Sequence, residues 1–108
     1  MEVQLMAVYA DIAVLRPVSR LDMLMEDDFR ERVAALVAQC RVQIIVDFAR
    51  VDFLDARGVA ALVHAKKAVH VAGGALRLRN LNEQVKLVLR LTNLDRVLPV
   101  LDDYAAAA

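Results

Sequence analysis

Three aspartates and an arginine between positions 47 and 57 are of the residue types that chemistry most often uses. Asp47, Asp52 and Asp55 are followed by Arg57 and Gly58. Paired carboxylates can bind a metal ion or act as a general acid and base. No histidine and no nucleophilic side chain stands beside them in the sequence. We therefore expect these aspartates to form turns and a helix cap.

The histidines and the cysteine do not form a pattern typical of catalysis. His64 and His70 are six residues apart, so they do not share a helix face as an i, i+4 metal-binding pair does. We expect both to be partly exposed. Cys40 is the only cysteine, which excludes an intramolecular disulfide, and we expect its thiol to be buried on a helix. The sequence also lacks a catalytic triad, a phosphate-binding glycine loop and metal-ligand spacing, so we expect no enzyme activity, no cofactor and no metal.

The composition is that of a small domain with ample material for a core. The 108 residues include 14 basic and 14 acidic side chains, and 59% are hydrophobic. This length predicts a single domain over residues 1–108. No apolar stretch is long enough to span a membrane, and the first residues are unlike a signal peptide, so we expect a cytoplasmic protein without direct membrane insertion. The hydrophobic excess favours a partner or a homo-oligomer.

The charges are distributed unevenly along the chain. Residues 1–56 hold ten acidic and six basic side chains, whereas residues 57–90 hold seven basic side chains and one acidic side chain. The basic stretch is explained either by an acidic partner or a nucleotide, or by the solvated side of two helices and a strand. It contains no aromatic residue for base stacking, so we expect no nucleic-acid binding.

The elements that must position these residues alternate between strands and helices. Alternation on this scale predicts crossover connections and an α/β fold with a mostly parallel sheet of four to five strands and about four helices. An opening hairpin adds an antiparallel strand. The expected strands are Val3–Val8, Ile12–Val18, Val42–Phe48, Leu76–Leu78 and Val97–Val100, and the expected helical segments are Glu26–Cys40, Ala56–Ala72, Asn82–Thr92 and Asp102–Ala107.

Four positions have the residue types that begin and end helices. Asp55 and Asn82 can accept hydrogen bonds from the free amides of a first helical turn. Gly73 and Asn93 tolerate the left-handed conformation that commonly follows a last turn. We expect Val85, Val88, Leu89 and Thr92 to face inward on the third long helix.

In this order, the sequence blocks resemble the STAS domain, a fold shared by bacterial anti-sigma-factor antagonists and the cytoplasmic tails of sulfate transporters. The resemblance covers essentially the whole chain and implies the STAS fold. The blocks that carry it are Ser19–Asp22, Ile45–Phe48, Val51–Asp55 with Gly58, Gly73–Leu78 and Val88–Val100.

One loop departs from the family pattern. The STAS switch loop usually reads Asp-Ser-Ser-Gly or Asp-Ser-Thr-Gly, and its second hydroxyl residue accepts phosphate from a partner kinase. Here the loop from Asp55 to Gly58 reads Asp-Ala-Arg-Gly, with Arg57 at the acceptor position. The chain has one serine, Ser19, and one threonine, Thr92, both outside this loop. The resemblance therefore implies no phosphoacceptor at the usual site.

The resemblance implies a regulatory binding module, with no catalytic residues. The expected partner is an anti-sigma factor or serine kinase of the GHKL type, bound without phosphorylation control. The alternatives are an accessory subunit of an ABC-type lipid-transport ATPase and a protomer of a larger stress-sensing STAS assembly. Arg57 either contacts the partner or is a solvated residue paired with Asp55. The partner-binding residues carried over from the family are Asp22, Asp55, Ala56, Arg57, Gly58 and Ala61.

Overall fold

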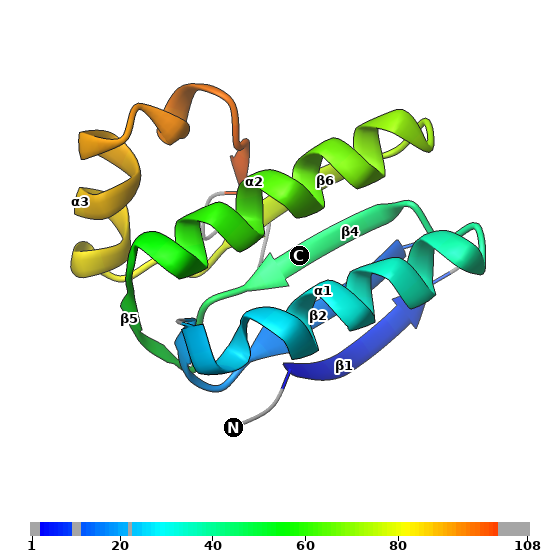
Figure 1. Cartoon of the computed structure of the whole chain (residues 1–108), viewed down its shortest axis with the longest axis horizontal. Helices are drawn as coiled ribbons and strands as arrows, with labels where there is room; N and C mark the ends of the chain where they lie inside the picture. The colour runs from blue at the N-terminus through cyan, green and yellow to red at the C-terminus, as the bar shows by residue number, and fades with distance from the viewer. Residues whose placement is uncertain (1–2, 10–11, 22, 102–108) are drawn as a thin grey trace.

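The computed structural model describes residues 3–9, 12–21 and 23–101, and side-chain surroundings within 12–18 and 26–100. A five-stranded sheet has the order β1-β2-β4-β6-β7, and β3 pairs with β5 in a second, two-stranded sheet (Figure 1). The strands are β1 (Val3–Tyr9), β2 (Ile12–Pro17), β3 (Ser19–Leu21), β4 (Gln43–Asp47), β5 (Val51–Leu54), β6 (Ala75–Arg79) and β7 (Val100–Leu101); the helices are α1 (Met23–Ala38), α2 (Ala56–Val71), α3 (Glu83–Leu91) and the short 3-10 helix η1 (Leu94–Arg96).

The main sheet is parallel except at its first strand. The neighbouring pairs β2–β4, β4–β6 and β6–β7 are parallel, and β1 runs antiparallel to β2. The helices α1 and α2 provide crossovers between parallel strands, as the alternating sequence pattern requires. The predicted α/β fold with an opening hairpin and a mostly parallel sheet is confirmed.

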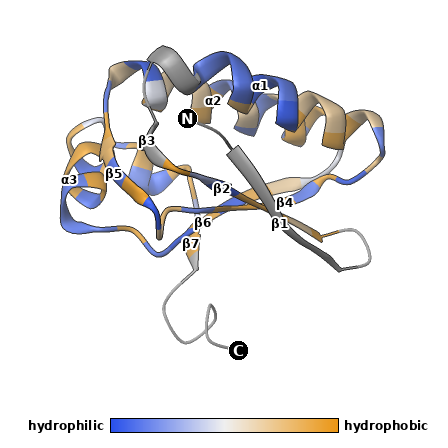
Figure 2. Cartoon of the chain, turned by 90° about the horizontal axis from the view of Figure 1, so that it is seen from below, coloured by the Kyte–Doolittle hydropathy of each residue, from blue (hydrophilic) through white to orange (hydrophobic). Residues whose placement is uncertain are grey.

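Both long helices cover the same face of the sheet. Figure 2 shows α1 and α2 side by side above the strands, while α3 lies at the end of the molecule next to β5. The strands place alternate side chains under the helices, because successive residues of a strand point to opposite faces. The core beneath the helices includes Leu15, Phe29, Ile44, Val46, Leu62, Val69, Leu76 and Leu78, each at most 3% exposed.

Three strand predictions were incomplete. The structure has strands at β3 and β5, where the sequence predicted none, because each gains its hydrogen bonds from the other. In β5, Val51 and Leu54 are buried while the two residues between them are exposed, so the segment lacks the two-residue alternation by which strands are detected. The expected last strand at Val97–Val100 starts later than predicted, as the two-residue strand β7 at Val100–Leu101, after the turn that follows η1.

The predictions for α1 and for Thr92 also need correction. Helix α1 begins at Met23 and ends at Ala38, so it starts before Glu26 and does not include Cys40. Cys40 is exposed with φ of 60°, because the chain leaves the helix there and turns its thiol away from the core. Thr92 is exposed rather than inward, and its hydroxyl donates to the carbonyl oxygen of Val88 at 2.8 Å. The helical segment expected at Asp102–Ala107 lies outside the described residues.

The predicted helix-ending residues are confirmed. Gly73 follows α2 with φ of 89°, and Asn93 follows α3 with φ of 59°. Both conformations lie in the left-handed region that glycine and asparagine tolerate best. The Gly74 amide then donates to the carbonyl oxygen of Val69 at 2.9 Å, which closes the last turn of α2 and directs the chain into β6.

Candidate functional site

The site predicted from the sequence lies where β5 ends and α2 begins. Asp55 takes an extended conformation between the two elements, and its Oδ1 accepts a hydrogen bond from the Gly58 amide at 2.9 Å. This satisfies one of the amides that the first turn of a helix leaves without an intrahelical partner. The predicted N-cap role of Asp55 is confirmed, and it fixes the direction in which α2 leaves the strand.

Two polar side chains from the start of α3 hold β5 in place. The Gln84 side chain accepts from the Leu54 amide at 3.0 Å and donates to the Leu54 carbonyl oxygen at 3.1 Å. Asn82 donates to the Val51 carbonyl oxygen at 2.8 Å and also caps α3 by accepting from the Val85 amide at 2.9 Å. Because β5 is only four residues long, these bonds fix the strand that positions the start of α2. Sequence reasoning found the cap but not the contacts with β5.

The predicted partner-binding residues divide between the surface and the interior. Ala56 and Arg57 are exposed and Asp55 is half-buried, so these three are accessible at the start of α2. Gly58 and Ala61 are buried on the face of α2 that packs inward. Asp22, the sixth predicted residue, lies outside the described residues.

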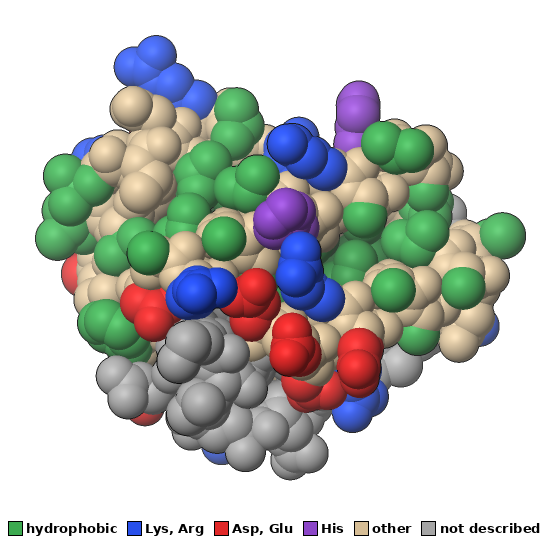
Figure 3. All heavy atoms as spheres, viewed as in Figure 1, with side chains coloured by type: hydrophobic (Ala, Val, Ile, Leu, Met, Phe, Trp, Pro, Cys, Tyr) green, Lys and Arg blue, Asp and Glu red, His purple; other side chains and the backbone are tan. Residues whose placement is uncertain are grey.

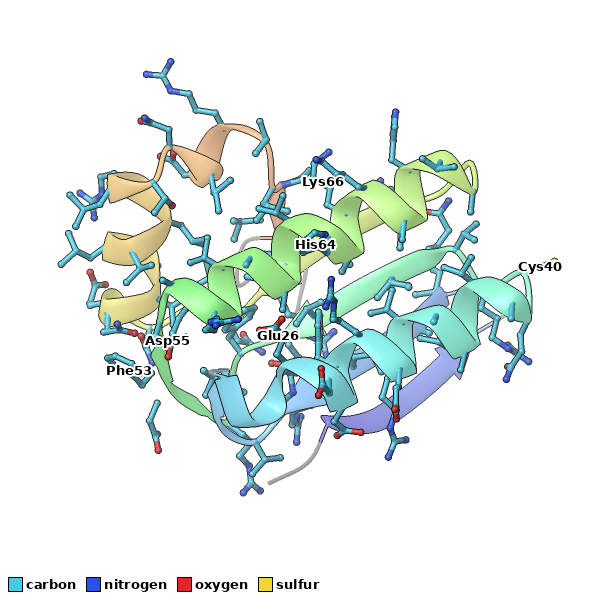
Figure 4. All side chains as sticks on the ribbon, viewed as in Figure 1. Glu26, Cys40, Phe53, Asp55, His64 and Lys66 are labelled. Atoms are coloured by element: carbon cyan, nitrogen blue, oxygen red, sulfur yellow. The ribbon has the colours of Figure 1, made fainter. Side chains whose placement is uncertain are left out.

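Arg57 extends toward α1 instead of toward its own cap residue. Its side chain is 63% exposed, and Nη1 lies 3.7 Å from Glu26 Oε2. Glu26 is also 3.6 Å from Arg30, one turn further along α1. The alternative in which Arg57 pairs with Asp55 is therefore replaced by a pair with Glu26 on the neighbouring helix. Figure 4 shows Glu26 between the two helices.

An exposed aromatic ring lies beside this helix start. Phe53 is 37% exposed on β5, two residues before the Asp55 cap, and Figure 4 shows its side chain at the same edge of the molecule as Asp55. Aromatic side chains are enriched where proteins bind other proteins. The exposure of Phe53 follows from the short strand β5, which turns the ring outward. The sequence pattern did not predict that strand, so it did not predict the exposed ring.

The predicted aspartate group does not form a joint site. Asp47 is fully buried and Asp52 is exposed, while Asp55 is occupied as a cap. Within the described residues, no three histidine, cysteine or acidic side chains come together as metal ligands do. His64 and His70 are both exposed on α2. The three aspartates thus have separate structural surroundings.

Asp47 is the centre of a buried polar cluster on the sheet face opposite the helices. Its Oδ2 lies 3.1 Å from Arg79 and 3.4 Å from Arg16, and its Oδ1 accepts from Asn80 at 3.0 Å and from the Ala49 amide at 2.9 Å. Burial raises the pKa of Asp47, but the hydrogen bonds from Ala49, Asn80 and Arg79, with the charge of Arg79, bring that pKa below its usual value. The bond to Ala49 confirms the predicted turn, and the cluster ties three strands together.

The threonine hydroxyl belongs to the end of α3 and not to the start of α2. Thr92 follows the last turn of α3, where its Oγ1 is bonded to the backbone. Ser19 belongs to β3, and its side chain lies outside the described surroundings. The start of α2 itself carries alanine and arginine side chains, neither of which has a hydroxyl oxygen to accept phosphate.

Two similar sequences are named as candidate anti-sigma factor antagonists. A protein of Thermotoga maritima named as a candidate anti-sigma factor antagonist is 32% identical over 65 residues, which make up 60% of this chain and 58% of that protein. A homologue from Thermotoga neapolitana matches to the same extent. The match thus spans less than two thirds of the length of these relatives.

Solved structures and the family profile agree with this fold. The crystal structure of a candidate anti-sigma factor antagonist from Thermotoga maritima superposes with a TM-score of 0.83 at 26% identity, covering 90% of this chain and 83% of that one. The unphosphorylated anti-sigma factor antagonist SpoIIAA gives 0.81 at 23% identity, covering 97% and 92%. None of the described helices is long and apolar enough to cross a membrane. The STAS domain profile matches residues 5–107, and this chain belongs to the STAS domain family.

Proposed function

We propose that this STAS domain acts as an anti-sigma factor antagonist, binding an ATP-dependent anti-sigma kinase of the GHKL type through the start of α2. The similarity to proteins named as anti-sigma factor antagonists supports this function. Membership of the STAS family supports the use of this helix as the docking element. The domain spans residues 1–108 in this proposal, works in the cytoplasm, and binds its partner without catalysing a reaction.

The exposed start of α2 is the observation that carries the proposal. Ala56 and Arg57 project from a helix end that is fixed by the Asp55 cap and by the bonds from α3 to β5. A rigid surface loses little conformational entropy when a partner binds. Gly58 and Ala61 support this surface from the buried side, and Asp22 completes the proposed set from the sequence.

Arg57 gives the proposed docking surface a permanent positive charge. Its guanidinium is permanently charged and offers several donors to a carboxylate, and the weak, exposed pair with Glu26 can be exchanged for a partner's acid at little cost. Family members with a serine at this position would gain negative charge on phosphorylation. With arginine there, the proposed contact does not respond to that modification.

Affinity capture tests this proposal. The full chain serves as bait in cytoplasmic extract of its source organism, beside an Arg57→Glu bait, and captured proteins are identified by mass spectrometry. We expect the natural bait to recover a GHKL-type ATPase that Arg57→Glu does not recover. Arg96→Glu is the matched control, because Arg96 is exposed on η1 and its substitution makes the same change of charge away from the start of α2.

The other outcomes separate the competing functions. Recovery of an ABC-type ATPase in place of a GHKL kinase contradicts the anti-sigma proposal and supports the transport alternative. Equal recovery of the kinase by all three baits would show that Arg57 does not contribute to the interface. Circular dichroism of each bait establishes that the variants are folded before the captures are compared.

A further inference from the structure

The outward side of α1 carries an acidic stripe with small residues beyond it. Its exposed positions are spaced three or four residues apart, the spacing that places side chains on one helix face. The stripe consists of Asp27, Glu31, Ala34 and Ala38, all exposed. Within the described chain, no basic group pairs with Asp27 or Glu31, whereas Glu26 lies 3.6 Å from Arg30 and Asp28 lies 3.6 Å from Arg32.

The outward side of α2 carries a basic and apolar stripe. Val63, Lys67 and Val71 follow one another at four-residue intervals, and Val71 is 86% exposed. Lys66 lies next to Lys67 on the edge of a hollow of about 230 Å³ that Val63 and Val97 also line. Neither lysine has an acidic partner among the residues whose side chains are described.

These two stripes lie on the same face of the molecule. Figure 3 shows acidic side chains gathered toward one edge of this face, basic and histidine side chains next to them and across its middle, and hydrophobic side chains to either side. The two helices run side by side in the same direction (Figure 1). Arg30 and Ala34 of α1 share a hollow with His64 and Ala68 of α2, so the acidic stripe and the basic stripe stand at similar heights along the helices.

We propose that this face binds a second copy of the chain in a two-fold symmetric dimer. The axis would run between α1 and α2, parallel to both, within the plane of contact. Rotation by half a turn about such an axis places the α1 stripe of each copy over the α2 stripe of the other. Asp27 and Glu31 then face Lys66 and Lys67 of the second copy, and the same contact occurs twice.

Charge complementarity favours a second copy over an unrelated partner. An unrelated acidic helix would pair with the lysines but would leave the α1 acids without a basic partner. A second copy pairs both sets at once, and it covers Val63 and Val71. The exposed alanines Ala34 and Ala38 let the helices approach closely, since they add no bulk between the backbones.

Sedimentation velocity of the full chain tests the dimer. Over about two decades of protein concentration we expect the mass to rise from 12.0 kDa toward twice that value. Added salt should shift this transition to higher concentration, because it screens exposed charge pairs. The Lys66→Glu/Lys67→Glu variant and the Asp27→Lys/Glu31→Lys variant should each dimerise at least about tenfold more weakly.

Mixing the two charge-reversed variants tests the proposed charge pairing most directly. In the mixture, every acid faces a base again, so a heterodimer should form with close to the natural affinity. Arg90→Glu/Arg96→Glu is the matched control, since both residues are exposed on α3 and η1, and it should dimerise like the natural chain. Any one of three results overturns the proposal. The natural chain remains monomeric, a charge-reversed variant dimerises as strongly as the natural chain, or the mixture of two folded reversed variants does not associate.

These outcomes are distinct from those of the docking experiment. The reversed residues exclude Arg57, and the capture variant leaves both charged stripes unchanged. Loss of the dimer therefore leaves the proposed kinase contact standing, and loss of the kinase contact leaves the dimer standing.

Discussion

Asp55 and Asp47 have the same type of side chain, but their different surroundings give the two carboxylates different structural roles. Asp55 is half-buried and bonds to the Gly58 amide at the start of α2. Asp47 is buried among two arginines, an asparagine and a backbone amide. The first holds the direction of a helix, and the second holds neighbouring strands together.

Removing the cap should weaken the start of α2. Asp55→Ala leaves the Gly58 amide without its side-chain partner, and we expect the free energy of unfolding to fall by about 1 kcal/mol. Urea unfolding followed by circular dichroism measures this change. Asp52→Ala is the matched control, because Asp52 is exposed on β5, and it should change the same quantity by less than about 0.5 kcal/mol. Equal effects of the two substitutions would show that the cap contributes nothing.

The buried Asp47 should make stability depend on pH in the acid range. Its pKa is lower in the folded chain than in an unfolded one, where it is about 3.9. The unfolded state therefore binds a proton first as the pH falls, and the stabilisation from Asp47 is lost between about pH 4 and its lower native pKa. Above this range, Asp47→Asn should lower the free energy of unfolding by about 1–3 kcal/mol.

Urea titrations of both proteins at several pH values check this expectation. The difference in unfolding free energy between the natural chain and Asp47→Asn should be constant near neutrality and should shrink as the pH falls through the acid range. A difference that grows on acidification would mean that the pKa of Asp47 is raised in the fold.

At the scale of elements, the turn from α2 to β6 constrains its two glycines in different ways. A Cβ on Gly74 would collide with the carbonyl oxygen and the Cβ of Val42, so we expect Gly74→Ala to lower the free energy of unfolding by about 3 kcal/mol. Gly73 has open space around it but a φ of 89°, so Gly73→Ala should cost about 1–2 kcal/mol. Thermal and urea unfolding of both variants measure which substitution lowers the free energy of unfolding more. A smaller loss for Gly74→Ala than for Gly73→Ala would contradict this expectation.

Local signals in the sequence explain which elements could be predicted. The caps at Asp55 and Asn82 and the left-handed positions at Gly73 and Asn93 depend on nearby backbone groups, and all four were predicted. The parallel core strand β4 was predicted because its run of apolar residues is typical of burial on both faces.

Long-range contacts explain what could not be predicted. Strands β3 and β5 exist through pairing with each other, and β5 is also bonded by side chains of α3. The pair between Arg57 and Glu26 joins residues of two different helices. Cys40 is exposed because its helix stops two residues earlier than the apolar pattern indicated. Each of these features depends on tertiary packing that residue spacing does not contain.

At the scale of the whole molecule, the proposed contacts occupy different parts of one helical face. The start of α2 presents Ala56 and Arg57 for the proposed kinase, and the later turns of α2 present Lys66 and Lys67 for a second copy. Both depend on α1 and α2 covering the same side of the sheet. The opposite side carries the Asp47 cluster, which holds that sheet together.

The most direct test of the proposed docking is the affinity of a purified GHKL-type kinase, once captured from the source organism, for the natural chain and for Arg57→Glu. Isothermal titration with ATP present should give an affinity for Arg57→Glu that is lower by about tenfold or more, because the reversed charge meets the partner's acids. Arg96→Glu should bind like the natural chain, and ATP should add no phosphate to residues 55–58. Equal affinities of the natural chain and Arg57→Glu would contradict docking through the start of α2.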